Sequence, residues 1–62
     1  MRQAYQFVGT STHTLELDPS EYRGMSTPQI TREVKKLLAG IAPGVSFFPE
    51  DIAQAVHELA AE

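Results

Sequence analysis

The sequence predicts an α+β fold in which a two-stranded antiparallel hairpin is followed by two packed helices, in the order ββαα. Two short segments within residues 4–17 alternate apolar with polar residues, which is the period of a half-buried strand. From position 30 onward, apolar residues recur every three or four positions, which is the period of a helix. Since two strands alone are marginal in water, the helices must cover one face of the hairpin.

The length and the lack of cysteine limit the number of domains and the ways in which the fold can be stabilised. We treat its 62 residues as a single small domain, residues 1–62, of a size that buries only about 60% of its unfolded surface. Without cysteine, neither a disulfide nor a thiolate zinc site can stabilise it, which leaves good packing or a homodimer. The sequence has no signal-peptide pattern and no apolar run near the ~20 residues that span a bilayer. We therefore expect a cytoplasmic protein without membrane contact.

The hairpin is predicted from a period of two. Tyr5 and Phe7 flank a polar residue in the first segment, as Leu15 and Leu17 do in the second. The loop between them carries Gly9, which can adopt the positive φ that short hairpin loops often require. The alternative is one strand followed by an extended segment.

A one-turn helix is predicted between the hairpin and the main helices. Residues 18–21 match a capping box, with aspartate at the cap, proline at the first helical position and glutamate three residues after the cap. Gly24 follows at once, so the turn is short, and we expect Tyr22 and Met25 to pack beneath it.

The strongest helix signal spans residues 27–40. Thr27 is the predicted cap, Pro28 suits the first helical position, and Gly40 stands where a left-handed residue would end the helix. We expect this helix to run from about Pro28 to Ala39. Its apolar stripe is Ile30, Val34, Leu37, Leu38 and Ile41.

A second helix is predicted at the C-terminal end. Pro43-Gly44 predicts a turn, residues 45–48 form a short extended piece, and Pro49 opens the helix. The buried stripe of this helix is Ile52, Val56 and Leu59. The predicted core is therefore Tyr5, Phe7, Leu15, Leu17, Ile30, Val34, Leu37, Leu38, Ile41, Ile52, Val56 and Leu59.

The net charge of −3 is unevenly distributed. Residues 1–44 contain all five Lys and Arg, whereas residues 45–62 contain four carboxylates, the last being Glu62, and no Lys or Arg. Such an acidic end opposes broad contact with phosphates, because nucleic-acid affinity comes from cations that replace counterions. The usual interpretation of such charges is a solvated helix face.

Nucleic-acid binding is the alternative function. Arg32, Lys35 and Lys36 recur at i, i+3 and i+4, which places them on the side of the main helix opposite its apolar stripe. Residues 49–56 also resemble the first helix of helix-turn-helix domains, but the sequence holds no recognition helix after them.

Catalysis is not expected, and neither a cofactor nor a metal is predicted. His13 and His57 lie in no motif that would orient a nucleophile, and their spacing predicts no metal site. Glu50 and Asp51 are adjacent in the first turn of a helix, where the helix dipole explains them.

A protein-binding surface is the preferred function. Phe47 and Phe48 point to opposite sides of an extended segment, so both are buried only if that segment is sandwiched. Either both pack on the protein, or one is exposed as an interface anchor. The unpaired hairpin edges and the acidic residues Glu50 and Asp51 provide further contacts. The sequence thus predicts a small regulator, inhibitor or adaptor that binds through Phe47, Phe48, Glu50 and Asp51.

Overall fold

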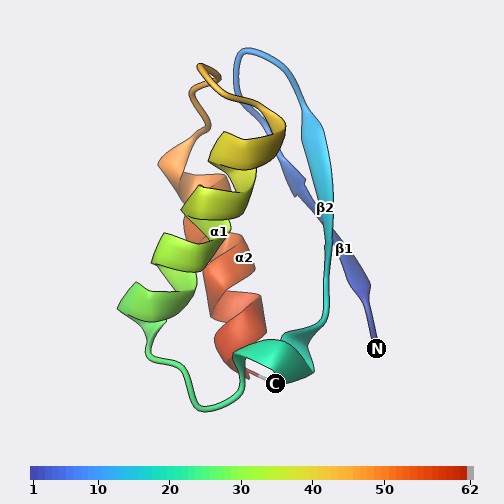
Figure 1. The fold of residues 1–62 in the computed structure, drawn as a ribbon, viewed down its shortest axis with the longest axis vertical. Coiled ribbons are helices and arrows are strands. Elements are labelled where there is room, and N and C mark those ends of the chain that lie inside the picture. Colours follow the sequence, from blue (N-terminus) through green and yellow to red (C-terminus); the bar gives the residue numbers. More distant parts are fainter. Residues whose placement is uncertain (62) are drawn as a thin grey trace.

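The molecule has two layers, a hairpin and a pair of antiparallel helices that it covers (Figure 1). The computed structural model describes residues 1–61; Glu62, the last carboxylate of the acidic end, lies outside them. The elements are β1 (Gln3–Phe7), β2 (His13–Leu17), the 3₁₀ helix η1 (Pro19–Tyr22), α1 (Thr27–Ile41) and α2 (Pro49–Ala61). The predicted ββαα order with a one-turn helix is confirmed.

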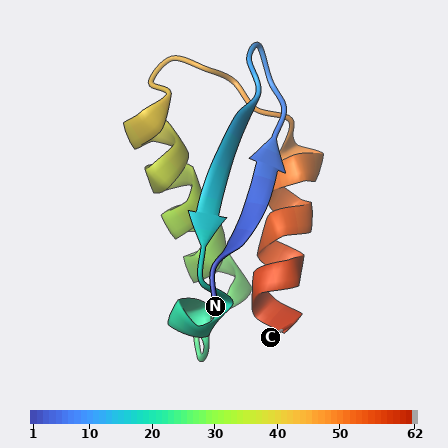
Figure 2. The same ribbon diagram turned by 90° about the vertical axis from the view of Figure 1, so that its right-hand side faces the viewer.

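The hairpin has the alternation that the sequence predicts. β1 and β2 pair antiparallel, with Tyr5 opposite Leu15 and Phe7 opposite His13. The side chains of Tyr5, Phe7, Leu15 and Leu17 are buried, whereas the residues between them are exposed. Both helices lie behind the hairpin, α1 on the β2 side and α2 on the β1 side (Figure 2).

The extended piece between the helices adds to the outer edge of β1. The backbone N–H of Phe48 donates to the carbonyl of Val8 at 3.0 Å, and the N–H of Thr10 donates to the carbonyl of Ser46 at 3.3 Å. This edge is therefore paired near Val8 and Thr10, whereas the sequence predicts that both hairpin edges are unpaired.

Gly9 lies at the centre of this contact, opposite Phe47. It does not have the positive φ that the sequence predicts for the loop; within residues 1–61, the glycines with positive φ are Gly24 and Gly44. Instead, a Cβ at Gly9 would overlap the carbonyl oxygen of Ser46. Glycine is needed here for the close approach of two backbones.

Helix α1 starts one residue earlier than predicted. Its cap is Ser26, and the prediction of Thr27 was wrong. The Ser26 N–H donates to Gln29 Oε1 at 2.9 Å, and the Gln29 N–H donates to Ser26 Oγ at 3.4 Å. This reciprocal pair is a capping box, which satisfies more backbone donors than a cap at Thr27 would.

The end of α1 also differs from the prediction. Gly40 lies inside the helix, which continues to Ile41 and is capped by Ala42. The Ala42 N–H still donates to the Leu38 carbonyl at 2.9 Å. Because Pro43 disfavours helical backbone at the residue before it, the helix stops at this proline instead of at the glycine.

The core lies between the hairpin and the helices. Its members are Tyr5, Phe7, Leu15, Leu17, Tyr22, Ile30, Val34, Leu38, Ala55, Val56 and Leu59, with Met25, Phe47 and Ile52 partly buried against them.

The prediction that Leu37 and Ile41 belong to the core was wrong: Leu37 is 41% exposed and Ile41 is 50% exposed. Residues of a helix are rotated by about 100° each, which places Leu37 on the flank of α1 away from α2. A sheet of two strands is too narrow to cover that flank.

The turn at η1 is capped by Asp18, as predicted, without a return bond from Glu21 within residues 1–61. Asp18 Oδ1 accepts from the Ser20 N–H at 3.0 Å, the Ser20 hydroxyl at 2.8 Å and the Met1 ammonium at 3.1 Å. The bonds from Ser20, then the Met1 ammonium, lower the pKa of Asp18. Tyr22 is buried as expected, and this burial raises the pKa of its hydroxyl.

Candidate functional site

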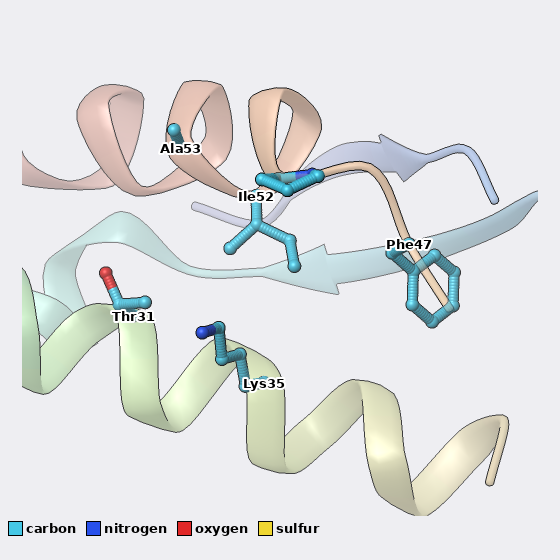
Figure 3. A pocket seen from close by; sticks show the side chains of 6 residues that line it. Thr31, Lys35, Phe47, Ile52 and Ala53 are labelled. Atoms are coloured by element: carbon cyan, nitrogen blue, oxygen red, sulfur yellow. The ribbon is translucent and has the colours of Figure 1, made fainter. Parts of the chain in front are cut away.

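A groove runs between α1 and α2 on the face away from the hairpin (Figure 3). Its central cavity has a volume of about 270 Å³. The residues that line it come from both helices and from the segment that joins them: Thr31, Lys35, Phe47, Pro49, Ile52 and Ala53.

Two further cavities extend this groove, because they share lining residues with the central one. An open hollow of about 450 Å³ toward the start of α1 is lined by α1 alone and includes Thr31, Arg32 and Lys35. Another of about 210 Å³ includes Lys35, Phe47 and Ile52. Lys35 lines all three cavities. We call the three together the interhelical groove.

Local sequence explains why the groove is open. Thr31 and Lys35 are four residues apart, so they share the flank of α1 that faces α2. Ala53 and Thr31 are short, and short side chains leave space between the two helices (Figure 3).

Phe47 closes one end of the groove. Its ring is half-buried and meets Phe7 edge-on at a centroid distance of 6.4 Å. It also meets His13 edge-on at 5.8 Å. These contacts pack the ring against the hairpin, and it presents an apolar surface at this end of the groove.

The groove is positively charged. Its charged lining residues are Arg32 and Lys35, and no carboxylate lines any of the three cavities. Among residues 1–61, the one ion pair joins the Met1 ammonium to Asp18, so neither cation is neutralised by a neighbouring acid.

The predicted basic face is therefore divided. Lys35 lines all three cavities, Arg32 lines only the one toward the start of α1, and Lys36 lines none of them. The reason is rotation about the helix: Lys36 follows Lys35 by about 100°, which turns it to the outer side of α1.

Phe48 takes the exposed position that the sequence could not assign between the two phenylalanines. It is 53% exposed, and its cross-strand neighbour Val8 is 37% exposed. Directly opposed residues share one face of a sheet, and Val8 points away from the side occupied by Phe7. Val8 and Phe48 thus form a small apolar pair on the outer face of the hairpin, separate from the interhelical groove.

The two predicted acidic contacts differ in what they do. Asp51 Oδ2 accepts the Val8 N–H at 2.8 Å, so this carboxylate joins α2 to the edge of β1. Glu50 is exposed in the first turn of α2. Of the pair, Glu50 is the residue whose side chain is open to a partner.

The two histidines have different surroundings. His13 Nε2 lies 2.9 Å from Ser11 Oγ, while His57 is exposed on α2. Within residues 1–61, no three His, Asp or Glu side chains gather where they could hold a metal ion. In the same part of the chain, no helix is both long and apolar enough to cross a membrane.

Sequence reasoning missed the groove because its members come from distant parts of the chain. The one available signal was the short side chain of Ala53 on α2, which allows a neighbour to approach.

No protein-family model matches this chain, and neither a curated protein nor a solved structure was found to be similar to it.

Proposed function

We propose that this protein is a non-enzymatic protein-binding module, a regulator, inhibitor or adaptor, whose interhelical groove holds an amphipathic helix of its partner. The observation that carries the proposal is the combination of apolar lining with Lys35 at its centre and no lining carboxylate. A helix with an apolar stripe flanked by Asp and Glu complements such a surface.

The shape of the groove favours a helix over other segments. Two antiparallel helices leave a groove along their axes, and a third helix can pack there at an interaxial distance of about 8–10 Å. Ile52 and Phe47 would contact apolar side chains of the bound helix. Lys35, which lines all three cavities, and Arg32, which lines the one toward the start of α1, would pair with its carboxylates.

A designed peptide tests this directly. The probe is a synthetic amphipathic helix with a leucine stripe flanked by glutamates, and its comparison is the same peptide with lysine in place of each glutamate. We expect the glutamate peptide alone to bind in fluorescence anisotropy. In amide chemical-shift mapping, the largest changes should fall on Thr31, Lys35 and Ile52.

Charge reversal at neighbouring lysines provides the matched control. Lys35→Glu should weaken binding of the glutamate peptide about tenfold, which corresponds to ~1.4 kcal/mol. Lys36→Glu makes the same charge change outside the groove and should have a much smaller effect. Equal losses in the two variants would contradict the groove as the site, because a general charge effect would explain them.

The same pair of variants tests nucleic-acid binding by Arg32, Lys35 and Lys36. Labelled duplex and single-stranded DNA or RNA, titrated at ~50 mM salt, should then bind with a steep salt dependence. Contacts to phosphates would make Lys35→Glu and Lys36→Glu equally harmful. That result, with no binding of the glutamate peptide, would replace the proposal by this alternative.

Phe48 and Glu50 remain predicted contacts for a partner larger than one helix. They lie outside the groove, so Phe48→Ala should leave binding of the glutamate peptide unchanged. Quantitative capture with wild type, Lys35→Glu and Phe48→Ala would separate partners that need the groove from those that need the Val8–Phe48 pair. A native partner lost with neither variant would exclude both surfaces.

A further inference from the structure

The two edges of the hairpin differ in how their backbone groups are used. At the β1 edge, the N–H of Val8 donates to Asp51, and its carbonyl accepts from Phe48. Both groups therefore point away from β2. In an antiparallel strand, the N–H and C=O of one residue point to the same edge, and the edge alternates from residue to residue.

This alternation identifies the groups that are open on β2. If Val8 points outward, Phe7 points toward β2, and its partner His13 points back toward β1. Thr14 and Glu16 then direct their N–H and C=O groups away from the hairpin. Within residues 1–61, no third strand pairs with β2 and no backbone bond outside the ladder reaches these two residues.

Apolar surface borders this open edge. Leu37 and Ile41, the largest apolar side chains left exposed on α1, are four residues apart. Leu37 follows Lys35 by two residues, about 200° around the helix, so it lies on the flank of α1 away from the groove, and Ile41 is exposed in the last turn of the same helix. Figure 2 shows α1 on the β2 side of the molecule, so the flank of α1 that is turned away from α2 lies on the same side as the free edge.

We infer that the β2 edge pairs antiparallel with the same edge of a second copy, forming a four-stranded sheet and covering Leu37 and Ile41. A partner for this surface must provide an open strand edge for β2 and an apolar surface for Leu37 and Ile41. A second copy related by a two-fold axis provides both. This inference is independent of the function proposed for the groove.

Charge and topology together select the register. An axis at Glu16 would oppose two carboxylates, which is unfavourable. Helix α1 runs antiparallel to β2, so its C-terminal half, with Leu37, lies toward the His13 end of the strand (Figure 2). Of the two residues whose backbone groups point outward, Thr14 is the better centre, because an axis there keeps the Glu16 side chains apart and lies nearer the end of β2 beside the C-terminal half of α1.

Single cysteines test this register, because the natural chain has none. Thr14→Cys would face its own copy across the axis, at a Cα separation of about 5.5 Å that a disulfide can span. Gln6→Cys is the matched control, since Gln6 lies directly opposite Thr14 on β1 and is also exposed. Mild oxidation should convert most of the Thr14→Cys variant into covalent dimer and leave Gln6→Cys at background.

Sedimentation equilibrium measures the unmodified protein. From micromolar to millimolar concentration, the wild-type mass should rise toward twice the chain mass. Leu37→Lys should remain monomeric with an unchanged circular dichroism spectrum, because position 37 is half-exposed and needs no repacking. Ala53→Glu, on the groove face, should dimerise like wild type.

Three results would overturn the inference. They are a monomeric wild type at millimolar concentration, a dimer that survives Leu37→Lys, and crosslinking of Gln6→Cys or Glu16→Cys in preference to Thr14→Cys. None of these bears on binding of the glutamate peptide, so failure here leaves the groove proposal to its own test.

Discussion

A single added methyl group at Gly9 should lower the stability of the protein. It allows residues 46–48 to approach β1, and a Cβ would overlap the carbonyl of Ser46, which is backbone and cannot rotate away. Gly9→Ala should therefore lower the free energy of unfolding by about 2 kcal/mol, a typical cost of overpacking. Urea unfolding followed by circular dichroism measures this change.

Gly40→Ala is the matched control for the same chemical change. Gly40 lies in a helix with nothing within 4 Å of an added Cβ. Alanine should therefore stabilise the protein by about 0.5–1 kcal/mol, because it restricts the unfolded chain and favours helix. If both variants lose stability equally, the close approach at Gly9 is not what requires glycine there.

Asp18 should make the protein more stable above its titration range than below it. Three hydrogen bonds to its carboxylate lower its folded pKa below the ordinary value of 3.8. A lowered pKa adds stability above the unfolded value, and that stability is lost as the pH falls through the folded value. Asp18→Asn keeps a capping side chain but has no charge to titrate.

The pH dependence of the variants checks this sign. Wild type should be more stable than Asp18→Asn at pH ~6, and the gap should shrink as the pH falls below 3.8. Ser20→Ala removes the hydroxyl that contributes most to the shift, so its dependence on pH should be intermediate. A gap between wild type and Asp18→Asn that stays constant with pH would contradict the assignment.

At the scale of elements, the sequence predicted which helices and strands exist better than it predicted their ends. Apolar periodicity identified all four because each element buries one face. The ends depend on competition between neighbouring residues: Ser26 with Gln29 forms a better cap than Thr27. Likewise, Gly40 can end a helix but does not have to, whereas Pro43 restricts the residue before it.

Asp51 joins α2 to β1 through a hydrogen bond, and its removal should weaken this attachment. Its carboxylate accepts the Val8 N–H at 2.8 Å, and a bond of this kind contributes about 1–2 kcal/mol. Asp51→Ala should lower stability by ~1 kcal/mol more than Glu50→Ala, which changes the same first turn without this bond.

Hydrogen exchange gives the local readout for the same pair. The Val8 amide should exchange faster in Asp51→Ala than in Glu50→Ala, because only the first variant loses its acceptor. Equal exchange at Val8 in the two variants would mean that the bond contributes nothing to the attachment of α2.

At the scale of the whole molecule, the candidate surfaces depend on contacts that no local pattern contains. Lys35 and Phe47 were assigned to different predicted functions, and the fold places both in one groove. Leu37 and Ile41 fit the apolar stripe of α1, but a two-stranded sheet covers only part of that stripe. Periodicity reports that a side chain is apolar; the width of the neighbouring layer decides whether it is buried.

The width of the sheet leads to a prediction about thermal stability. If two hairpins join at β2, the folded dimer is favoured by mass action, so the unfolding midpoint of wild type should rise with protein concentration. Leu37→Lys should match wild type at micromolar concentration, where both are monomers, and should show no rise. Ala53→Glu should rise as wild type does, since position 53 lies on the groove face. A wild-type midpoint that stays constant to millimolar concentration would mean that Leu37 and Ile41 remain exposed in solution and that the two-stranded sheet is complete by itself.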